Sequence, residues 1–66
     1  MKTDSKANEF EHAIADNIIA EMNTSGNWYL KNTQSGMVSK ELFISPRIAS
    51  KALDGNLFTW TNELHE

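Results

Sequence analysis

The pattern of apolar and polar positions divides the chain into five short elements. Over residues 8–22 the apolar side chains recur at three- and four-residue steps, the spacing of one stripe on a helix: Phe10, Ala13, Ile14, Ile18 and Met22. Asn8 and Glu11 stand three residues apart, as in a capping box. Loop-forming residues follow at 23–27. The pattern therefore predicts a first helix over residues 8–22.

Three later segments are typical of β-strands. Residues 28–31 are short and aromatic, and turn-forming residues lie on both sides of them. Residues 37–44 follow a five-residue loop that contains Gly36, so the two segments predict a β-hairpin. Residues 57–61 are rich in β-forming side chains and predict a last strand.

The clearest local signal is the pair Ser45-Pro46. Ser is favoured at the N-cap of a helix, and Pro is favoured at the first helical position. A two-turn apolar stripe follows, and Gly55 stands where a helix commonly ends. The sequence therefore predicts a short helix over residues 46–54.

Together these elements predict an α+β fold in the order α-β-β-α-β. It is a single small domain over residues 1–66 with a three-stranded antiparallel sheet and two helices, and residues 1–7 and 62–66 are loose. We expect the helices to cover the sheet face that carries Trp28, Leu30, Val38, Leu42, Ile44, Phe58 and Trp60. The other face would then present an apolar partner-binding surface formed by Tyr29, Met37, Phe43 and Leu57. If one helix covers each face instead, no such surface remains.

Composition restricts the chemistry that the chain can perform. It has no Cys and only three isolated Gly, so it offers neither a thiolate metal site nor a Gly-rich phosphate loop. Its histidines are far apart, and the spacing of His12 and Asp16 indicates a surface pair on the first helix. We therefore expect no catalytic residue, metal, cofactor or small-molecule substrate, and hence no enzyme. No apolar run indicates a signal peptide or a membrane span, which favours a cytoplasmic location.

Charge is distributed unevenly along the chain. The formal net charge is −3. Residues 1–27 have two Lys against five acids, residues 28–54 have four basic residues against two acids, and residues 55–66 have two Glu and no basic residue. The weakly basic middle segment leaves a nucleic-acid contact open as an alternative.

Residues 44–55 resemble the turn and recognition helix of helix-turn-helix repressors of the lactose-repressor and phage Cro types. The likeness lies in the apolar-Ser entry, the small residues inside and the closing Asp-Gly, whereas Phe43 stands where that motif usually has Gly. The resemblance implies an all-α fold with residues 35–42 as the preceding helix. It directs Arg47, Ser50 and Lys51 to the major groove and the other basic residues, Lys31 and Lys40, to phosphates.

Two functions follow from these patterns. The leading hypothesis is a non-enzymatic regulatory or adaptor protein that binds another protein or forms a homodimer, in the manner of small phage or plasmid accessory proteins. The alternative is a helix-turn-helix DNA-binding transcriptional regulator. A further alternative uses Trp28, Tyr29 and Trp60 to stack the bases of single-stranded nucleic acid.

Overall fold

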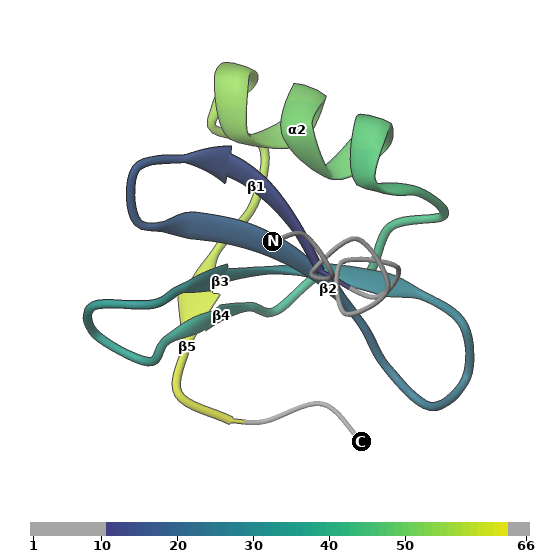
Figure 1. Ribbon diagram of the computed structural model, residues 1–66, viewed down its shortest axis with the longest axis horizontal. Helices are drawn as coiled ribbons and strands as arrows, with labels where there is room; N and C mark the ends of the chain where they lie inside the picture. Colours follow the sequence, from purple (N-terminus) through teal and green to yellow (C-terminus); the bar gives the residue numbers. More distant parts are fainter. Residues whose placement is uncertain (1–10, 64–66) are drawn as a thin grey trace, which may run out of the picture.

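The computed structural model describes residues 11–63, which form one antiparallel sheet with a helix packed on it (Figure 1). The strands are β1 (Glu11–Ala15), β2 (Ile18–Met22), β3 (Trp28–Asn32), β4 (Val38–Ser39) and β5 (Trp60–Thr61). The helix α2 (Pro46–Gly55) lies between β4 and β5 in the sequence. The order in the sheet is β1-β2-β3-β4-β5, so each strand pairs with its neighbour along the chain. The α+β class and the antiparallel sheet are thus confirmed, but the described residues contain five strands and one helix instead of three strands and two helices.

Residues 11–22 form a β-hairpin, so the predicted helix over 8–22 is wrong for the part of it that the structure describes. The steps from Ile14 to Ile18 and from Ile18 to Met22 are four residues long, which fits about one helical turn and also two repeats of a strand. The polar pair Asp16-Asn17 forms the turn between β1 and β2, and both residue types favour turns. Residues 8–10, the predicted loose segment 1–7 and His65 lie outside the described residues.

The second hairpin is confirmed in part. β3 coincides with the predicted strand 28–31 and extends to Asn32, whereas its partner β4 is only two residues long. Opposite Leu30, the Ser39 side chain takes the place of a main-chain carbonyl as the acceptor of the Leu30 N–H. The Leu30 N–H donates to Ser39 Oγ at 3.0 Å, and the Ser39 hydroxyl donates to the Glu41 carbonyl at 2.9 Å. Ser39 is fully buried, so this hydroxyl satisfies the buried N–H of Leu30.

The all-α helix-turn-helix fold is wrong for this chain. Residues 35–42, which would have to form the first helix of the motif, contain strand β4 and no helix. Val38 pairs with Lys31 of β3 on one side and with Thr61 of β5 on the other. The segment is therefore held in extended form by both neighbours in the sheet.

The helix predicted over 46–54 is confirmed and extends one residue further, to Gly55. Ser45 is its N-cap, and Ser45 Oγ accepts the N–H of Ile48 at 3.3 Å. At the other end Asn56, not Gly55, adopts the left-handed conformation, with φ 55°. Asn tolerates this conformation better than most residues. Local sequence signals therefore define both ends of α2.

Small residues allow α2 to lie close against β2 and β3 (Figure 1). Ala49 and Ala52 of the helix and Ala20 of β2 are buried, and Trp28 and Leu30 complete the buried core. Larger, partly buried side chains surround this contact: Ile14, Ile18, Met22, Phe43, Leu53, Phe58 and Trp60. The main core cluster therefore lies between the sheet and α2, whereas Val38 is buried on the other side of the sheet.

Three residues that we expected on the helix-covered face do not face α2: Val38, Leu42 and Ile44. Val38 pairs with Lys31 and so lies on the opposite face from Leu30, although it is buried there. Leu42 and Ile44 are exposed to solvent.

Candidate protein-binding surface

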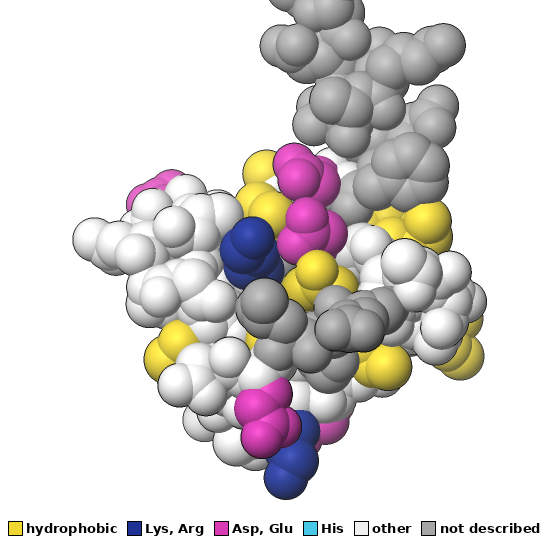
Figure 2. Space-filling model, turned by 90° about the horizontal axis from the view of Figure 1, so that it is seen from below, with side chains coloured by type: hydrophobic (Ala, Val, Ile, Leu, Met, Phe, Trp, Pro, Cys, Tyr) yellow, Lys and Arg dark blue, Asp and Glu magenta, His cyan; other side chains and the backbone are white. Residues whose placement is uncertain are grey.

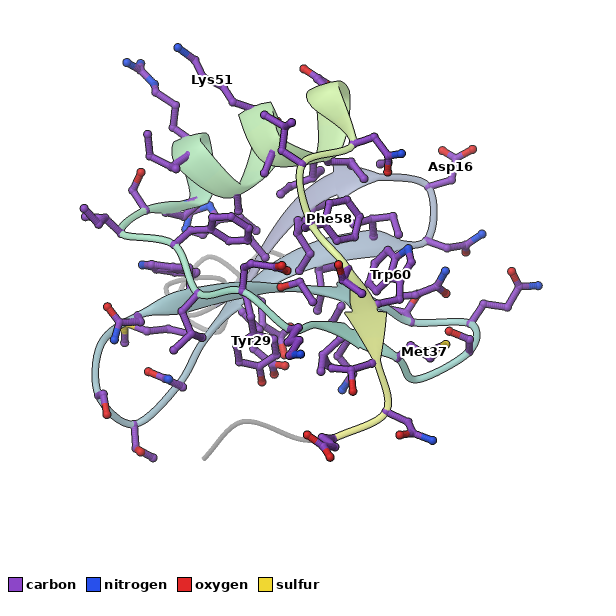
Figure 3. All side chains as sticks on the ribbon, turned by 180° about the vertical axis from the view of Figure 1, so that it is seen from behind. Asp16, Tyr29, Met37, Lys51, Phe58 and Trp60 are labelled. Atoms are coloured by element: carbon purple, nitrogen blue, oxygen red, sulfur yellow. The ribbon has the colours of Figure 1, made fainter. Side chains whose placement is uncertain are left out.

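The four residues predicted to form a partner surface do not come together. Phe43 pairs with Trp28, so it packs on the helix side, whereas the next residue of β3, Tyr29, points to the opposite side. Met37 lies in the connection between β3 and β4, apart from Tyr29 (Figure 3). Leu57 follows the end of α2 and is 71% exposed. The predicted surface of Tyr29, Met37, Phe43 and Leu57 is therefore not one contiguous surface.

The sheet face away from α2, here called the far face, carries a polar cluster. The strand register places these side chains on it: Glu11, Ala13, Ile19, Glu21, Tyr29, Lys31, Val38 and Thr61. The Tyr29 hydroxyl donates to Glu21 Oε1 at 2.8 Å, and Lys31 Nζ lies 3.9 Å from the same oxygen. Glu11 stands opposite Glu21 on β1.

These contacts change the acidity of the single tyrosine. Partial burial, the hydrogen bond to Glu21 and the negative charges of Glu21 and Glu11 raise the pKa of Tyr29 from 10.0 to about 12. The phenol therefore keeps its proton throughout the neutral range and acts as a hydrogen-bond donor. Seen from the side opposite α2, acidic and basic side chains lie between the apolar ones (Figure 2). Glu21, Tyr29 and Lys31 thus have partners within the far face itself.

Three aliphatic side chains are exposed close together in the sequence, where the chain enters α2. Ile44 is 84% exposed, Leu42 is 43% exposed and Ile48 is 45% exposed. We call Leu42, Ile44 and Ile48 the apolar cluster. Because Phe43 is directed into the core, its neighbours Leu42 and Ile44 are directed outward. Ile44 directly precedes the N-cap, and Ile48 lies in the first turn of the helix. The sequence analysis missed this surface because it assigned the face of residues 37–44 that carries Val38, Leu42 and Ile44 to the core, whereas in the structure Ser39 and Phe43 lie on the helix side.

The residues predicted to contact nucleic acid are divided between two sides of the molecule. Lys31 lies on the far face beside Glu21. Arg47 and Lys51 are exposed on α2, one helical turn apart. Ser50, which directly precedes Lys51, is half-buried. Lys51 projects from α2 away from the sheet (Figure 3). Lys40 is exposed in the segment that follows β4. Arg47 and Lys51 therefore lie on the same helix as Ile48, whereas Lys31 lies on the far face.

The structure also locates the pair of residues that the sequence suggested as a helix-surface pair, His12 and Asp16. His12 and Asp16 are not paired on a helix: His12 lies on β1, where its ring packs edge-on against Trp28 at 5.2 Å between centroids, and Asp16 lies in the turn. Residues 11–63 contain no group of three His, Asp or Glu side chains placed to hold a metal ion, and no pocket is found among them. Nor does this part of the chain include a helix long and apolar enough to cross a membrane.

The fold defines a small α+β domain in which an antiparallel meander carries one helix, inserted before its last strand. No family model, curated protein or solved structure matches the chain.

Proposed function

We propose that this chain is a non-enzymatic regulatory or adaptor domain that binds another protein through the apolar cluster of Leu42, Ile44 and Ile48. The observation that carries this proposal is the exposure of Ile44, at 84%, between two further exposed aliphatic side chains. Covering a fully exposed Ile contributes about 1.5–3 kcal/mol. Adjacent exposed apolar side chains with polar residues around them are typical of contact sites.

The non-enzymatic part of the proposal is supported by the chemistry of the groups that lie close together. Tyr29 and Lys31 both contact the Glu21 carboxylate on the far face. The Tyr29 phenol, with its pKa raised to about 12, is a poor acid and a poor base near neutral pH. These contacts serve the sheet, and we assign no catalytic role to them.

DNA binding in the helix-turn-helix manner is not retained, because the segment before α2 is extended and provides no first helix. Arg47 and Lys51 remain exposed cations on α2. Contact of these two cations with nucleic acid is therefore an alternative that the cross-linking experiment can detect.

A photo-cross-linking residue at position 44 tests the proposal in an extract of the cells that encode the chain. The same residue at position 57 is the matched control, since Leu57 is also highly exposed but lies beyond the other end of α2. We expect one protein to cross-link from position 44 and not from position 57. That protein, once purified, should bind the wild-type domain and lose at least tenfold in affinity for Ile44→Ser, but not for Leu57→Ser.

Two results would contradict the proposal. One is a purified partner that binds Ile44→Ser and the wild-type domain equally well. The other is cross-linking from position 44 to nucleic acid alone. Both variants should keep the native amide spectrum, because both side chains are exposed.

A further inference from the structure

The first strand, β1, forms one edge of the sheet, and no other described strand covers its outer side (Figure 1). Within residues 11–63, β1 pairs only with β2. β5, at the opposite edge, is two residues long, whereas β1 has five. The outer side of an edge strand presents main-chain N–H and C=O groups that can pair with an added strand. β1 is therefore the longer of the two edges at which a strand can be added.

The composition of β1 does little to prevent such pairing. Proteins protect their sheet edges with Lys, Pro, β-bulges or a covering segment. β1 contains neither Lys nor Pro, and four of its five side chains are exposed. Its protective feature is a register shift against β2 between Ala13 and Ala15, next to the turn. The regular part of this edge is therefore residues 11–13.

The far face beside this edge carries two carboxylates that oppose each other. Glu11 of β1 and Glu21 of β2 are partners in the strand register, and like charges in such a pair are destabilising. Glu21 is contacted by Lys31 and by the Tyr29 hydroxyl. No described residue forms an ion pair or a hydrogen bond with the Glu11 side chain. The hairpin of residues 11–22 contains no Lys or Arg, so it provides no cation to Glu11 itself.

We propose that β1 accepts an extended, basic segment of another protein, which adds to the sheet as a further strand. The main chain of that segment pairs with residues 11–13, and a Lys or Arg of the segment lies beside Glu11 and Glu21 on the far face. In this mode of recognition the main-chain hydrogen bonds supply affinity and the alternate side chains supply specificity. The added cation reduces the repulsion between the two carboxylates, so the pair that destabilises the isolated domain favours the complex.

This edge is separate from the apolar cluster. β2 and β3 lie between β1 and the segment of Phe43, which pairs with Trp28 of β3. The inference therefore goes beyond the proposed function and does not depend on it. A ligand at β1 and a ligand at the apolar cluster change the signals of different residues.

A second copy of the chain fits the edge less well than a basic segment. A two-fold, antiparallel pairing of β1 with itself keeps the far faces of both copies on the same side of the joined sheet. It would gather Glu11 and Glu21 of both copies there and add no cation beside Glu11. Nucleic acid would bring further negative charge to the same carboxylates. Like charges thus oppose both of these occupants.

Nuclear magnetic resonance titration of the full chain with defined peptides tests the inference. Three short peptides alternate Val with Lys, Gln or Glu, and a fourth repeats the Lys peptide with methylated main-chain nitrogens. Methylation keeps the charge but removes the N–H donors that strand pairing uses. We expect the Lys peptide to shift the amide signals of residues 11–15 and to bind about threefold to fivefold more tightly than the Gln peptide. The methylated peptide should not shift these signals.

Variants of Glu11 decide whether its carboxylate causes the preference. Glu11→Gln should bind the Lys and Gln peptides equally, and Glu11→Lys should prefer the Glu peptide. Glu63→Gln removes an exposed acid outside the hairpin and is the matched control, which should keep the wild-type order of affinities. Because Glu11→Gln also relieves the repulsion with Glu21, its unfolding temperature should equal or exceed that of the wild type.

Each other outcome overturns the inference. Equal binding of the Lys and Gln peptides would refute the role of charge, and equal binding of the methylated peptide would refute strand addition. Shifts at residues 42–48 in place of 11–15, or no shifts, would show that β1 takes no such segment. Concentration-dependent shifts at residues 11–15 without peptide would identify a second copy as the occupant. A lower unfolding temperature for Glu11→Gln would show that Glu11 stabilises the fold, while cross-linking from position 44 decides the proposed function separately.

Discussion

Phe43 and Trp28 are joined by two main-chain hydrogen bonds across the sheet. The Phe43 N–H donates to the Trp28 carbonyl at 2.6 Å, and the Trp28 N–H donates to the Phe43 carbonyl at 2.7 Å. This isolated bridge fixes which way the chain faces just before α2. It directs Phe43 into the core and leaves Leu42 and Ile44 in solvent. The proposed binding surface is thus a consequence of one pairing in the fold.

The first prediction compares Phe43 with its neighbour Ile44. Phe43→Ala should lower the free energy of unfolding by about 2–3 kcal/mol, because a partly buried aromatic ring is removed from the core. Ile44→Ala should change it by less than about 0.5 kcal/mol, because that side chain is already in water. Urea denaturation measures both values. Similar losses in the two variants would show that Ile44 is packed and is not free for a partner.

The second prediction concerns the ionisation of Tyr29. The chain contains one Tyr, so tyrosinate absorbance reports this residue alone. In the native protein the midpoint should lie near pH 12, against about 10 in the unfolded chain. Because the folded pKa is the higher one, the folded state favours the neutral phenol. This contribution to stability is complete below pH 10 and is lost as the pH rises toward 12.

Glu21→Gln tests the origin of this shift. Removing the carboxylate should lower the pKa of Tyr29 toward 10, although not fully, because burial is the largest cause of the shift. Glu63→Gln removes an exposed acid near the described C-terminal end and is the control. An unchanged midpoint in Glu21→Gln would contradict the hydrogen bond between Tyr29 and Glu21.

The third prediction concerns Ser39, the fully buried polar residue of β4. Ser39→Ala removes the acceptor of the Leu30 N–H and should cost about 1–3 kcal/mol, since a buried donor is left unsatisfied. Ser50→Ala, in α2, is the matched control and should be neutral or slightly stabilising, because Ala favours a helix more than Ser does. Thermal unfolding of the two variants measures the difference. A loss for Ser50→Ala as large as that for Ser39→Ala would argue against this role of the hydroxyl.

The fourth prediction distinguishes the hairpin from a helix over residues 11–22. Ala13 and Ala20 are seven residues apart and would share one face of a helix. In the sheet they lie on opposite faces, with Ala20 fully buried beneath α2 and Ala13 exposed on the far face. Ala20→Leu should therefore cost roughly 1–3 kcal/mol through overpacking, whereas Ala13→Leu should cost little. Equal effects of the two substitutions would favour the helix.

The sequence predicted those elements whose signals are local. The Ser45 side chain and the Pro46 ring are sufficient to define the start of α2. The aromatic composition of residues 28–31 is sufficient to predict β3. The first helix was wrong because four-residue steps fit both a helix and a strand. A polar pair such as Asp16-Asn17 indicates a turn, but it also occurs on the wet side of a helix. Only the pairing of β2 with β3 removes this ambiguity.

The exposed apolar cluster could not be predicted from the sequence for a different reason. Alternation along residues 37–44 groups Val38, Leu42 and Ile44 on one face, and the sequence prediction assigned that face to the core. In the structure the ladder between β3 and β4 is interrupted after Ser39 and resumes only at Phe43. Ser39 and Phe43, and not the more apolar set, face α2 on either side of this interruption, and this choice of face depends on the position of β3 and α2, which no local pattern contains. The cations Arg47 and Lys51 were identified from sequence, but the exposure of Leu42 and Ile44 was not.

The order of the strands also determines how the domain assembles. Since β1 to β4 follow one another both in the chain and in the sheet, each pairing closes a short loop, and folds rich in local contacts form quickly. β5 is the exception, because residues 40–59 separate it from β4. Its pairing closes the longest loop of the sheet and carries the largest entropy cost. We therefore expect the four-stranded meander to form first and β5 to add after α2 has packed, so that the C-terminal strand is the first to separate when the domain begins to unfold.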